Sequence, residues 1–375
     1  MDGFATNADL LAAVEGIGKP TRTIGYAPGG RPIVAVEAGG DREPAILVTA
    51  GAHATEHAGV CAAAALADSL ETDRRVVVIP TRDPVGIDGF DPAVALACDR
   101  TPSIDDPAAA QEMLAATGER IHEDEMFTVG LIGDYAYAIT HDRPAGSGVV
   151  LQQFKQYTES HPEILDQLAG RRVFTTTGSD DIDAAAPYER TYTIVVDPAG
   201  RPMHLNRFFT DDWAPVETRC VRAVMESLEP ALTIDCHETT AHENRFHVSL
   251  RPQPSDADTD REAALGRVIV DAVAARETPI ATDADVLGEP TSTVAHAADD
   301  ERPTDGFYRK SSRGAYWVDP HATDPPRLGE GLNAVDFAAD RYGLAVTLET
   351  GMGGSCGQRT DDAVAAVRAA IEFLD

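Results

Sequence analysis

Lysine is scarce in this chain of 375 residues, which contains it only at positions 19, 155 and 310. The 31 lysines and arginines stand against 62 aspartates and glutamates, so the formal net charge is −31. A surface this acidic repels nucleic acids and anionic membranes, and we expect neither as a partner. It also holds water and cations, which favours a halophilic protein that works at high salt.

Cysteine pairs and long apolar runs are also missing. The five cysteines are an odd number without a C-x-x-C pair, which argues against a disulfide framework. No apolar run approaches the roughly 20 residues that span a bilayer. The opening segment MDGFATNADL lacks the basic start and apolar core of a signal peptide. We therefore expect reduced thiols and a cytoplasmic protein, and nothing here indicates its oligomeric state.

Short apolar runs alternate with helical segments, which predicts an α/β fold. We expect strands at 22–26, 32–37, 44–50, 76–80, 191–196, 231–235 and 344–348, and helices at 60–70, 214–229, 260–276 and 361–374. Strand 44–50, helix 60–70 and strand 76–80 form a βαβ unit, so the sheet is at least partly parallel. The prediction is a three-layer α/β/α sandwich with a mixed, largely parallel sheet.

Residues 91–187 differ from this pattern. They contain helical segments at about 107–121 and 151–169 and several acidic loops, but no strong strand. We interpret them as an insertion within one catalytic domain that spans 1–375.

Three predicted strands lead into side chains that can bind metal or transfer protons. His53 and Glu56 follow strand 44–50, His237 follows 231–235, and Glu349 follows 344–348. Ligands of open α/β sheets bind where the carboxyl ends of strands meet. Two imidazoles and one carboxylate suit zinc, which activates water for hydrolysis. Glu349 suits the general base, because a glutamate that ends an apolar strand is seldom buried without a task.

The segment His53 to His57 has a second interpretation. It also fits the H-x-x-E-H pattern, in which both histidines bind zinc and the glutamate is the base. That pattern requires a helix, so that residues four apart share a face. Here the segment begins directly after a strand, which favours Glu56 as ligand and His57 as a neighbour. A second metal near His57, His242 or His247 stays open.

Several segments resemble the zinc carboxypeptidase (funnelin) family. GAHATEH resembles the family's G-x-H-x-x-E signature, and IGYAPGGRPIVAVEAGG resembles the glycine-rich turn before it. The resemblance implies one zinc per chain, with His53, Glu56 and His237 as ligands and Glu349 as base. HLNRFF resembles the family segment whose asparagine and arginine grip the substrate's carboxylate, here Asn206 and Arg207. The implied enzyme is a metallocarboxypeptidase, a zinc-dependent hydrolase that cleaves a peptide or amide bond next to a free carboxylate.

Some family positions are unassigned in this chain. His204 stands where the family has an aspartate. The arginine that polarises the scissile carbonyl is Arg190 or Arg201, and the tyrosine above the substrate is Tyr308 or Tyr316.

Two alternative functions remain open at this stage. DCHETT also resembles the aspartoacylase and succinylglutamate desuccinylase branch, which implies N-acyl amino acids as substrates. In that branch the base follows the third ligand more closely than Glu349 follows His237. A metal-binding or peptide-binding module without catalysis is the alternative from a different class, and the presence of Glu349 argues against it.

Overall fold

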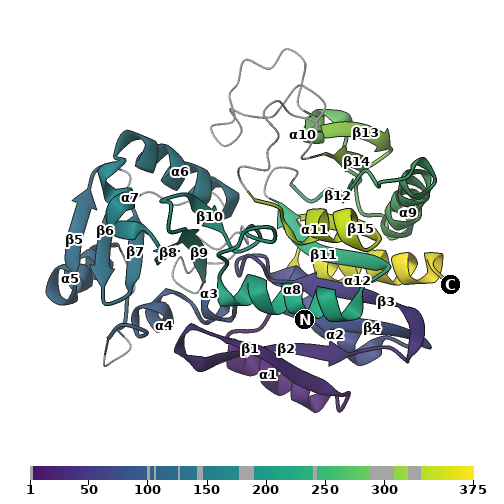
Figure 1. Ribbon diagram of the computed structural model, residues 1–375, viewed down its shortest axis with the longest axis horizontal. Coiled ribbons are helices and arrows are strands. Elements are labelled where there is room, and N and C mark those ends of the chain that lie inside the picture. Colours follow the sequence, from purple (N-terminus) through teal and green to yellow (C-terminus); the bar gives the residue numbers. More distant parts are fainter. Residues whose placement is uncertain are drawn as a thin grey trace.

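The computed structural model contains two β-sheets flanked by helices (Figure 1). It describes residues 3–98, 102–104, 107–125, 127–141, 147–176, 190–239, 243–287, 308–319 and 331–375. The larger sheet has nine strands and the smaller one has six. Helices cover both faces of the larger sheet, so the predicted α/β class and its three-layer arrangement are confirmed.

The larger sheet is mixed, and its parallel part lies at the centre. Its strands run in the order β1 (Thr21–Ala27), β2 (Arg31–Glu37), β4 (Arg74–Ile79), β3 (Arg42–Ala50), β11 (Leu232–Thr239), β15 (Leu344–Gly351), β12 (Phe246–Leu250), β14 (Ala315–Val318) and β13 (Tyr308–Ser312). The neighbours β4, β3, β11 and β15 are parallel. β2 joins β4 and β12 joins β15 in the antiparallel sense. The central strands therefore bring their carboxyl ends to one edge.

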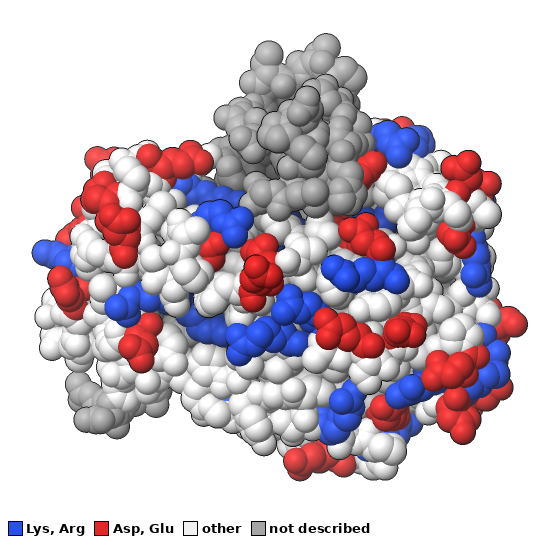
Figure 2. All heavy atoms as spheres, in the orientation of Figure 1, with Lys and Arg blue, Asp and Glu red and all other residues white. Residues whose placement is uncertain are grey.

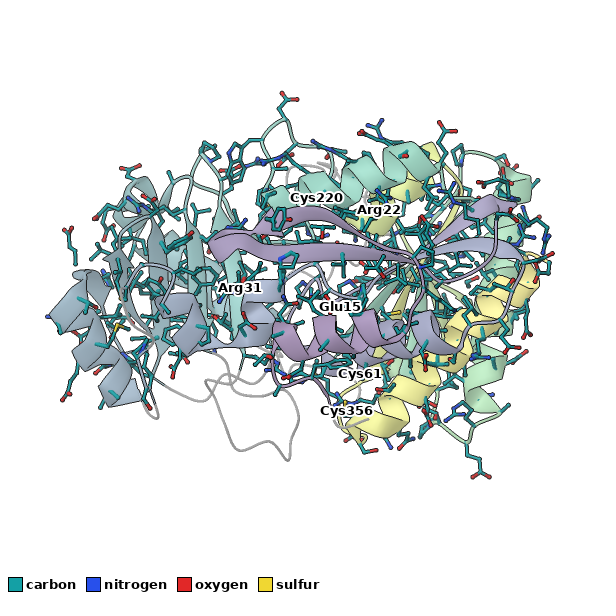
Figure 3. The ribbon with its side chains drawn as sticks, turned by 90° about the horizontal axis from the view of Figure 1, so that it is seen from below. Glu15, Arg22, Arg31, Cys61, Cys220 and Cys356 are labelled. Atoms are coloured by element: carbon teal, nitrogen blue, oxygen red, sulfur yellow. The ribbon has the colours of Figure 1, made fainter. Side chains whose placement is uncertain are left out.

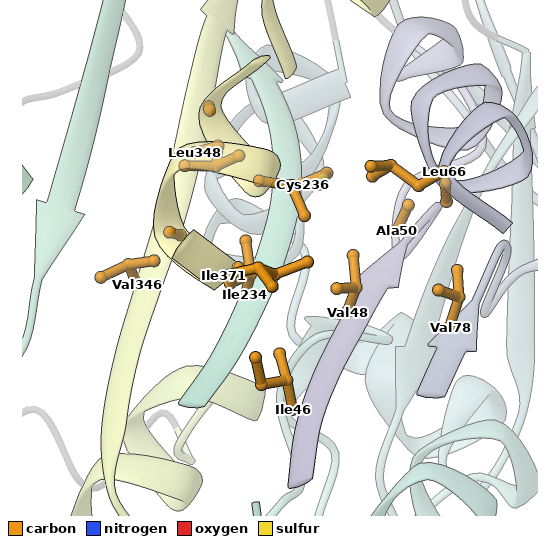
Figure 4. Packing of buried hydrophobic residues seen from close by; sticks show 14 of the residues in the cluster. Ile46, Val48, Ala50, Leu66, Val78, Ile234, Cys236, Val346, Leu348 and Ile371 are labelled. Carbon is orange, nitrogen blue, oxygen red and sulfur yellow. The ribbon is translucent and has the colours of Figure 1, made fainter. Parts of the chain in front are cut away.

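The central strands are buried along most of their length because both of their faces are covered. Ile46 and Val48 of β3 point toward α2 (His57–Ser69) and α12 (Cys356–Phe373), as Figure 4 shows. Their neighbour Leu47 packs in the opposite layer, against α8 (Val216–Leu228) and α11 (Ala334–Arg341). Side chains alternate across a strand, so each strand supplies both layers.

The remaining helices of the sandwich extend these two layers. α1 (Asn7–Gly16) and α9 (Asp256–Ala274) lie on the side of α2 and α12, whereas the short α4 (Phe90–Val94) lies on the side of α8. The last helix begins at Cys356, earlier than the predicted 361. The Ser355 hydroxyl accepts a hydrogen bond from the Gln358 amide and caps the helix there.

The segment expected to lack strands forms most of the smaller sheet, so that expectation is wrong. The order is β10 (Pro202–His204), β9 (Thr191–Val196), β8 (Arg172–Thr176), β7 (Tyr135–Thr140), β6 (Phe127–Ile132) and β5 (Glu119–Glu123). Around it lie α5 (Pro107–Thr117), α6 (Ser147–Ser160) and α7 (Glu163–Leu168). The strand predicted at 191–196 is β9 and pairs with β8 and β10, not with the larger sheet.

All five cysteines carry free thiols. Cys61 of α2 and Cys356 at the start of α12 lie beside each other, and Cys220 is on α8 (Figure 3). The neighbouring Cys356 thiol and burial raise the pKa of Cys61. A thiol that stays protonated is a poor nucleophile.

The charged surface is mixed on the face seen in Figure 2, where acidic side chains alternate with basic ones. Within the described residues, no helix is both long and apolar enough to cross a bilayer.

Candidate functional site

The carboxyl ends of β3, β11 and β15 lie side by side. Cys236 is in register with Ala50, and His237 is in register with Glu349. His53 and Glu56 occupy the short segment between β3 and α2. Sheet order thus brings four residues from three distant parts of the chain to one edge.

The three predicted metal ligands converge on one point. Glu56 Oε1 lies 2.6 Å from His53 Nδ1, and Glu56 Oε2 lies 2.7 Å from His237 Nδ1. One ligand atom from each residue lies within 4.8 Å of the other two. Glu56 is 3% exposed and His237 is 6% exposed, so the donors are withdrawn from bulk water. Two imidazole nitrogens and a carboxylate form a donor set that fits zinc.

The residue at which α2 begins distinguishes the two interpretations of the segment from His53 to His57. The helix begins at His57, and Glu56 is its N-cap residue. His53 and His57 therefore do not share a helical face, and the H-x-x-E-H arrangement is not formed. His57 lines a separate small cavity with Phe4 and Arg190. His247 belongs to no group of three donors among the described residues, and His242 lies outside them.

The other ring nitrogen, Nε2, of His53 and of His237 also has a polar partner. His53 Nε2 lies 2.8 Å from His204 Nδ1. His237 Nε2 lies 2.9 Å from Asp235 Oδ2. Such partners orient metal-binding imidazoles and set their tautomers. Burial and the neighbouring His53 keep the pKa of His204 well below its usual value, so a neutral His204 can accept the His53 Nε2 proton.

The charges of the groups around the Glu56 carboxylate favour the binding of a cation there. Burial opposes ionisation of Glu56, but the His53 and His237 imidazoles outweigh it and lower the pKa of Glu56 to about 2. Burial also acts against protonated His237, yet Asp235 and Glu56 raise the pKa of His237 well above its usual value. The His237 Nδ1 proton faces the Glu56 carboxylate. A divalent cation bound there would take the place of that proton.

Arg82 is a site residue that the sequence analysis missed. Its Nη2 donates to both carboxylate oxygens of Asp235, at 2.7 and 2.6 Å, and its Nη1 donates to Asn206 Oδ1 at 2.9 Å. Arg82 is 3% exposed and Asp235 is fully buried. Its position just after β4 could have indicated this role. β4 is parallel to its sheet neighbour β3, so both strands end at the same edge of the sheet.

Asn206, predicted to bind substrate, is part of this buried network. Besides Arg82, its Oδ1 accepts the Ala334 amide at 3.2 Å. Its Nδ2 donates to Asp235 Oδ2 at 3.2 Å and lies 3.0 Å from His237 Nε2. Asn206 is therefore held by the protein, with part of its surface facing the cavity.

A cavity of about 220 Å³ opens beside the three ligands. His53, His237 and Glu349 border it, and Arg207 and His204 form another part of the wall. Burial raises the pKa of Glu349 to about 8. Its carboxyl group therefore gains and loses a proton near neutral pH.

The structure shows which of the candidate arginines and tyrosines border the cavity. Arg190 donates to the Ala5, Ile87 and Phe4 carbonyls, and Arg201 pairs with Asp197 and Asp211, so neither borders the cavity. The cavity has Arg251 instead, which pairs with Asp336 in the wall. Tyr308 also borders it. The Tyr316 hydroxyl faces away, 3.1 Å from Asp283.

A G-x-S-x-G pattern, typical of serine hydrolases, occurs at 353–357. It follows β15 and leads into α12, as a nucleophile elbow would. Ser355 has φ −62°, without the strain of such an elbow, and its hydroxyl caps α12. We therefore assign Ser355 a structural role.

Asp235→Asn should weaken zinc binding by about 10- to 100-fold, because the His237 Nε2 proton loses its carboxylate acceptor. Competition between the protein and a fluorescent zinc chelator would measure this change. Asp197→Asn, which alters an acidic side chain paired with Arg201 outside the cavity, should leave the affinity unchanged. Equal zinc affinity of the wild type and the two variants would contradict the role given to Asp235.

No protein-family model matches the chain, and no curated protein matches it. Similar solved structures include a candidate metallopeptidase from Shewanella baltica, 11% identical, with a TM-score of 0.48 over 99% of this chain and 93% of that one. A candidate metallopeptidase from Shewanella amazonensis is 15% identical, with a TM-score of 0.46 over 98% and 92%. A metallo-carboxypeptidase from Pseudomonas aeruginosa is 14% identical, with a TM-score of 0.47 over 98% and 68%. At this level of likeness, the functional case rests on the site itself.

Proposed function

We propose that this protein is a zinc-dependent hydrolase that cleaves a peptide or amide bond next to a free carboxylate. One observation carries the proposal: His53 Nδ1, His237 Nδ1 and the Glu56 carboxylate converge beside a cavity that Glu349 also borders. A metal-binding donor set with a separate titratable carboxylate provides the groups that metal-assisted amide hydrolysis needs.

His53, Glu56 and His237 would hold one zinc ion. Zinc, when bound, supplies Lewis acidity, which polarises a carbonyl group and makes water a stronger acid. His204 and Asp235 hold the two imidazoles in the tautomers that leave each Nδ1 available to the metal.

Glu349 is the proton-transfer group in this proposal. A pKa of about 8 allows the carboxylate to accept a proton from water and then deliver it to the leaving amine. Glu349 lies in the cavity wall, on the strand beside the one that carries His237. The proton transfer would therefore take place beside the proposed metal ligands.

Arg207 is the proposed partner of the substrate's carboxylate. It borders the cavity, and a guanidinium can donate two parallel hydrogen bonds to a carboxylate. Asn206 supports this wall, because its amide is held by Arg82 and the Ala334 amide. A free carboxylate bound there would direct the adjacent amide toward His53 and Glu349.

The cavity is lined by polar side chains, and for this reason small N-acyl amino acids are a second candidate class of substrate. Ser249, Thr347 and the Arg251–Asp336 pair line the part of the wall contributed by β12, β15 and α11. These groups can hydrogen-bond a polar acyl group or side chain, whereas a wholly apolar pocket would not.

The proposal is tested by hydrolysis assays on protein kept at high salt. The substrates are N-blocked dipeptides with a free carboxyl terminus, the same dipeptides as C-terminal amides, and N-acyl amino acids. We expect cleavage of free acids, loss of activity with a chelator, and recovery with zinc. Chelator-resistant cleavage, or zinc binding without turnover of any substrate, would contradict the proposal, and the latter would favour a binding module.

A further inference from the structure

A second group of metal-binding side chains lies on the smaller sheet. His122 is on β5, Asp124 follows that strand, and His161 lies in the turn between α6 and α7. One ligand atom from each residue lies within 4.8 Å of the other two. β5 is the edge strand farthest from β10 in the sheet order. None of the three residues borders the cavity of the first site.

The strand geometry and the carboxylates around His161 favour a ligand between these side chains. The register of β5 against β6 shifts between Arg120 and His122, an irregularity that re-aims side chains at sheet edges. The His161 ring lies between two carboxylates, with Nε2 3.8 Å from Asp124 Oδ2 and Nδ1 3.7 Å from Glu163 Oε1. Both distances exceed a hydrogen bond.

Unpartnered polar atoms form an independent observation. His122 Nε2 is buried and has no hydrogen-bond partner among the described residues, and neither has the hydroxyl of Tyr157. Tyr157 is 2% exposed, and its ring lies 5.1 Å from the His122 ring and 5.2 Å from the His161 ring. A buried polar atom without a hydrogen-bond partner destabilises the folded protein. A metal ion bound to His122 would remove that destabilisation for the imidazole.

We propose that His122, Asp124 and His161 form a second metal site, which takes zinc or a similar divalent transition metal. Two imidazoles and one carboxylate are the nitrogen and oxygen donors that such ions prefer over calcium or magnesium. Tetrahedral zinc with bonds of about 2.0–2.1 Å needs donor atoms about 3.3 Å apart. His161 Nε2 and Asp124 Oδ2, which are 3.8 Å apart, would therefore move slightly closer on binding. The ion would tie the edge strand β5 to the turn between α6 and α7, and its role is structural.

Zinc content of the full chain tests the proposal. The wild-type protein, His161→Ala, His53→Ala and a matched control, His141→Ala, are saturated with zinc, desalted and analysed for metal. His141 is a histidine of the same sheet region that hydrogen-bonds Gln111 and Thr128 instead. We expect about two zinc ions per chain in the wild type and in His141→Ala, and about one in each of the other two variants.

The His53→Ala variant separates this proposal from the proposed function, because it retains only the second site. Zinc should raise its thermal unfolding temperature, and the double variant His53→Ala/His161→Ala should show no such rise. One zinc in the wild type and none in His53→Ala would overturn the second site and leave the first. Two zinc ions in a folded His161→Ala protein would also overturn it.

Discussion

Glu349→Gln is expected to bind zinc as the wild type does and to lose turnover by about 100- to 10,000-fold, the usual contribution of a general acid–base group. Glutamine has nearly the shape of glutamate but cannot accept the proton. Glu349 is not one of the three converging ligands, so metal binding should survive. The measurements are kcat on the substrate cleaved best in the hydrolysis assays, and zinc per chain.

Glu262→Gln is the matched control for Glu349→Gln. Burial also raises the pKa of Glu262 to about 8. Glu262 is fully buried and does not border the cavity. Its carboxylate accepts the Ala345 amide at 3.2 Å and also the backbone amide of Arg251, a residue of the cavity wall. Folded Glu262→Gln protein should keep most of its turnover. A fully active Glu349→Gln variant would show that another group moves the proton.

Arg82→Met is expected to lower the free energy of unfolding by about 3 kcal/mol, the low end of the range for a broken buried ion pair, because the buried Asp235 carboxylate loses its arginine partner and keeps only His237 as a cationic neighbour. Methionine keeps an apolar stem in the same space. Denaturant unfolding in the presence of a chelator measures the effect without a contribution from bound zinc.

Arg201→Met is the control for the Arg82 variant. Arg201 also pairs with an aspartate, but its side chain is 46% exposed. Its partner Asp197 is 5% exposed but also accepts the backbone amides of Ala199 and Arg201, each at 2.9 Å, so the loss of this half-exposed pair should cost only about 0–1 kcal/mol. Arg201 lies outside the cavity, and we expect turnover to be retained as well. Equal stability of the two variants would show that Arg82 and Asp235 do not form a stabilising pair.

The central sheet was predictable because its signal is local. The runs at 44–50, 231–235 and 344–348 are mostly apolar, and each corresponds to a strand of the parallel centre, β3, β11 or β15. Strands buried on both faces have this pattern wherever they lie in the chain.

The smaller sheet was missed because its strands are short and contain glycine and alanine. β6 and β7 read FTVGLI and YAYAIT, with weaker apolar patterns than the central strands. They are joined by Gly133 and Asp134, a pair of residues that favours a tight hairpin turn. That turn was the signal that could have revealed a hairpin inside the predicted insertion.

The sequence by itself determined which donors are available for a metal and that they lie at or just after the carboxyl ends of strands. His53, Glu56, His237 and Glu349 were identified on that basis. Only the tertiary structure decided which other residues meet them: Arg82 holds Asp235, His204 contacts His53, and Arg251 enters the cavity wall. Glu56 and His237 are 181 residues apart in the chain and 2.7 Å apart in space. Such contacts depend on the order of the strands in the sheet, which local periodicity does not encode because it reports only how one segment is buried.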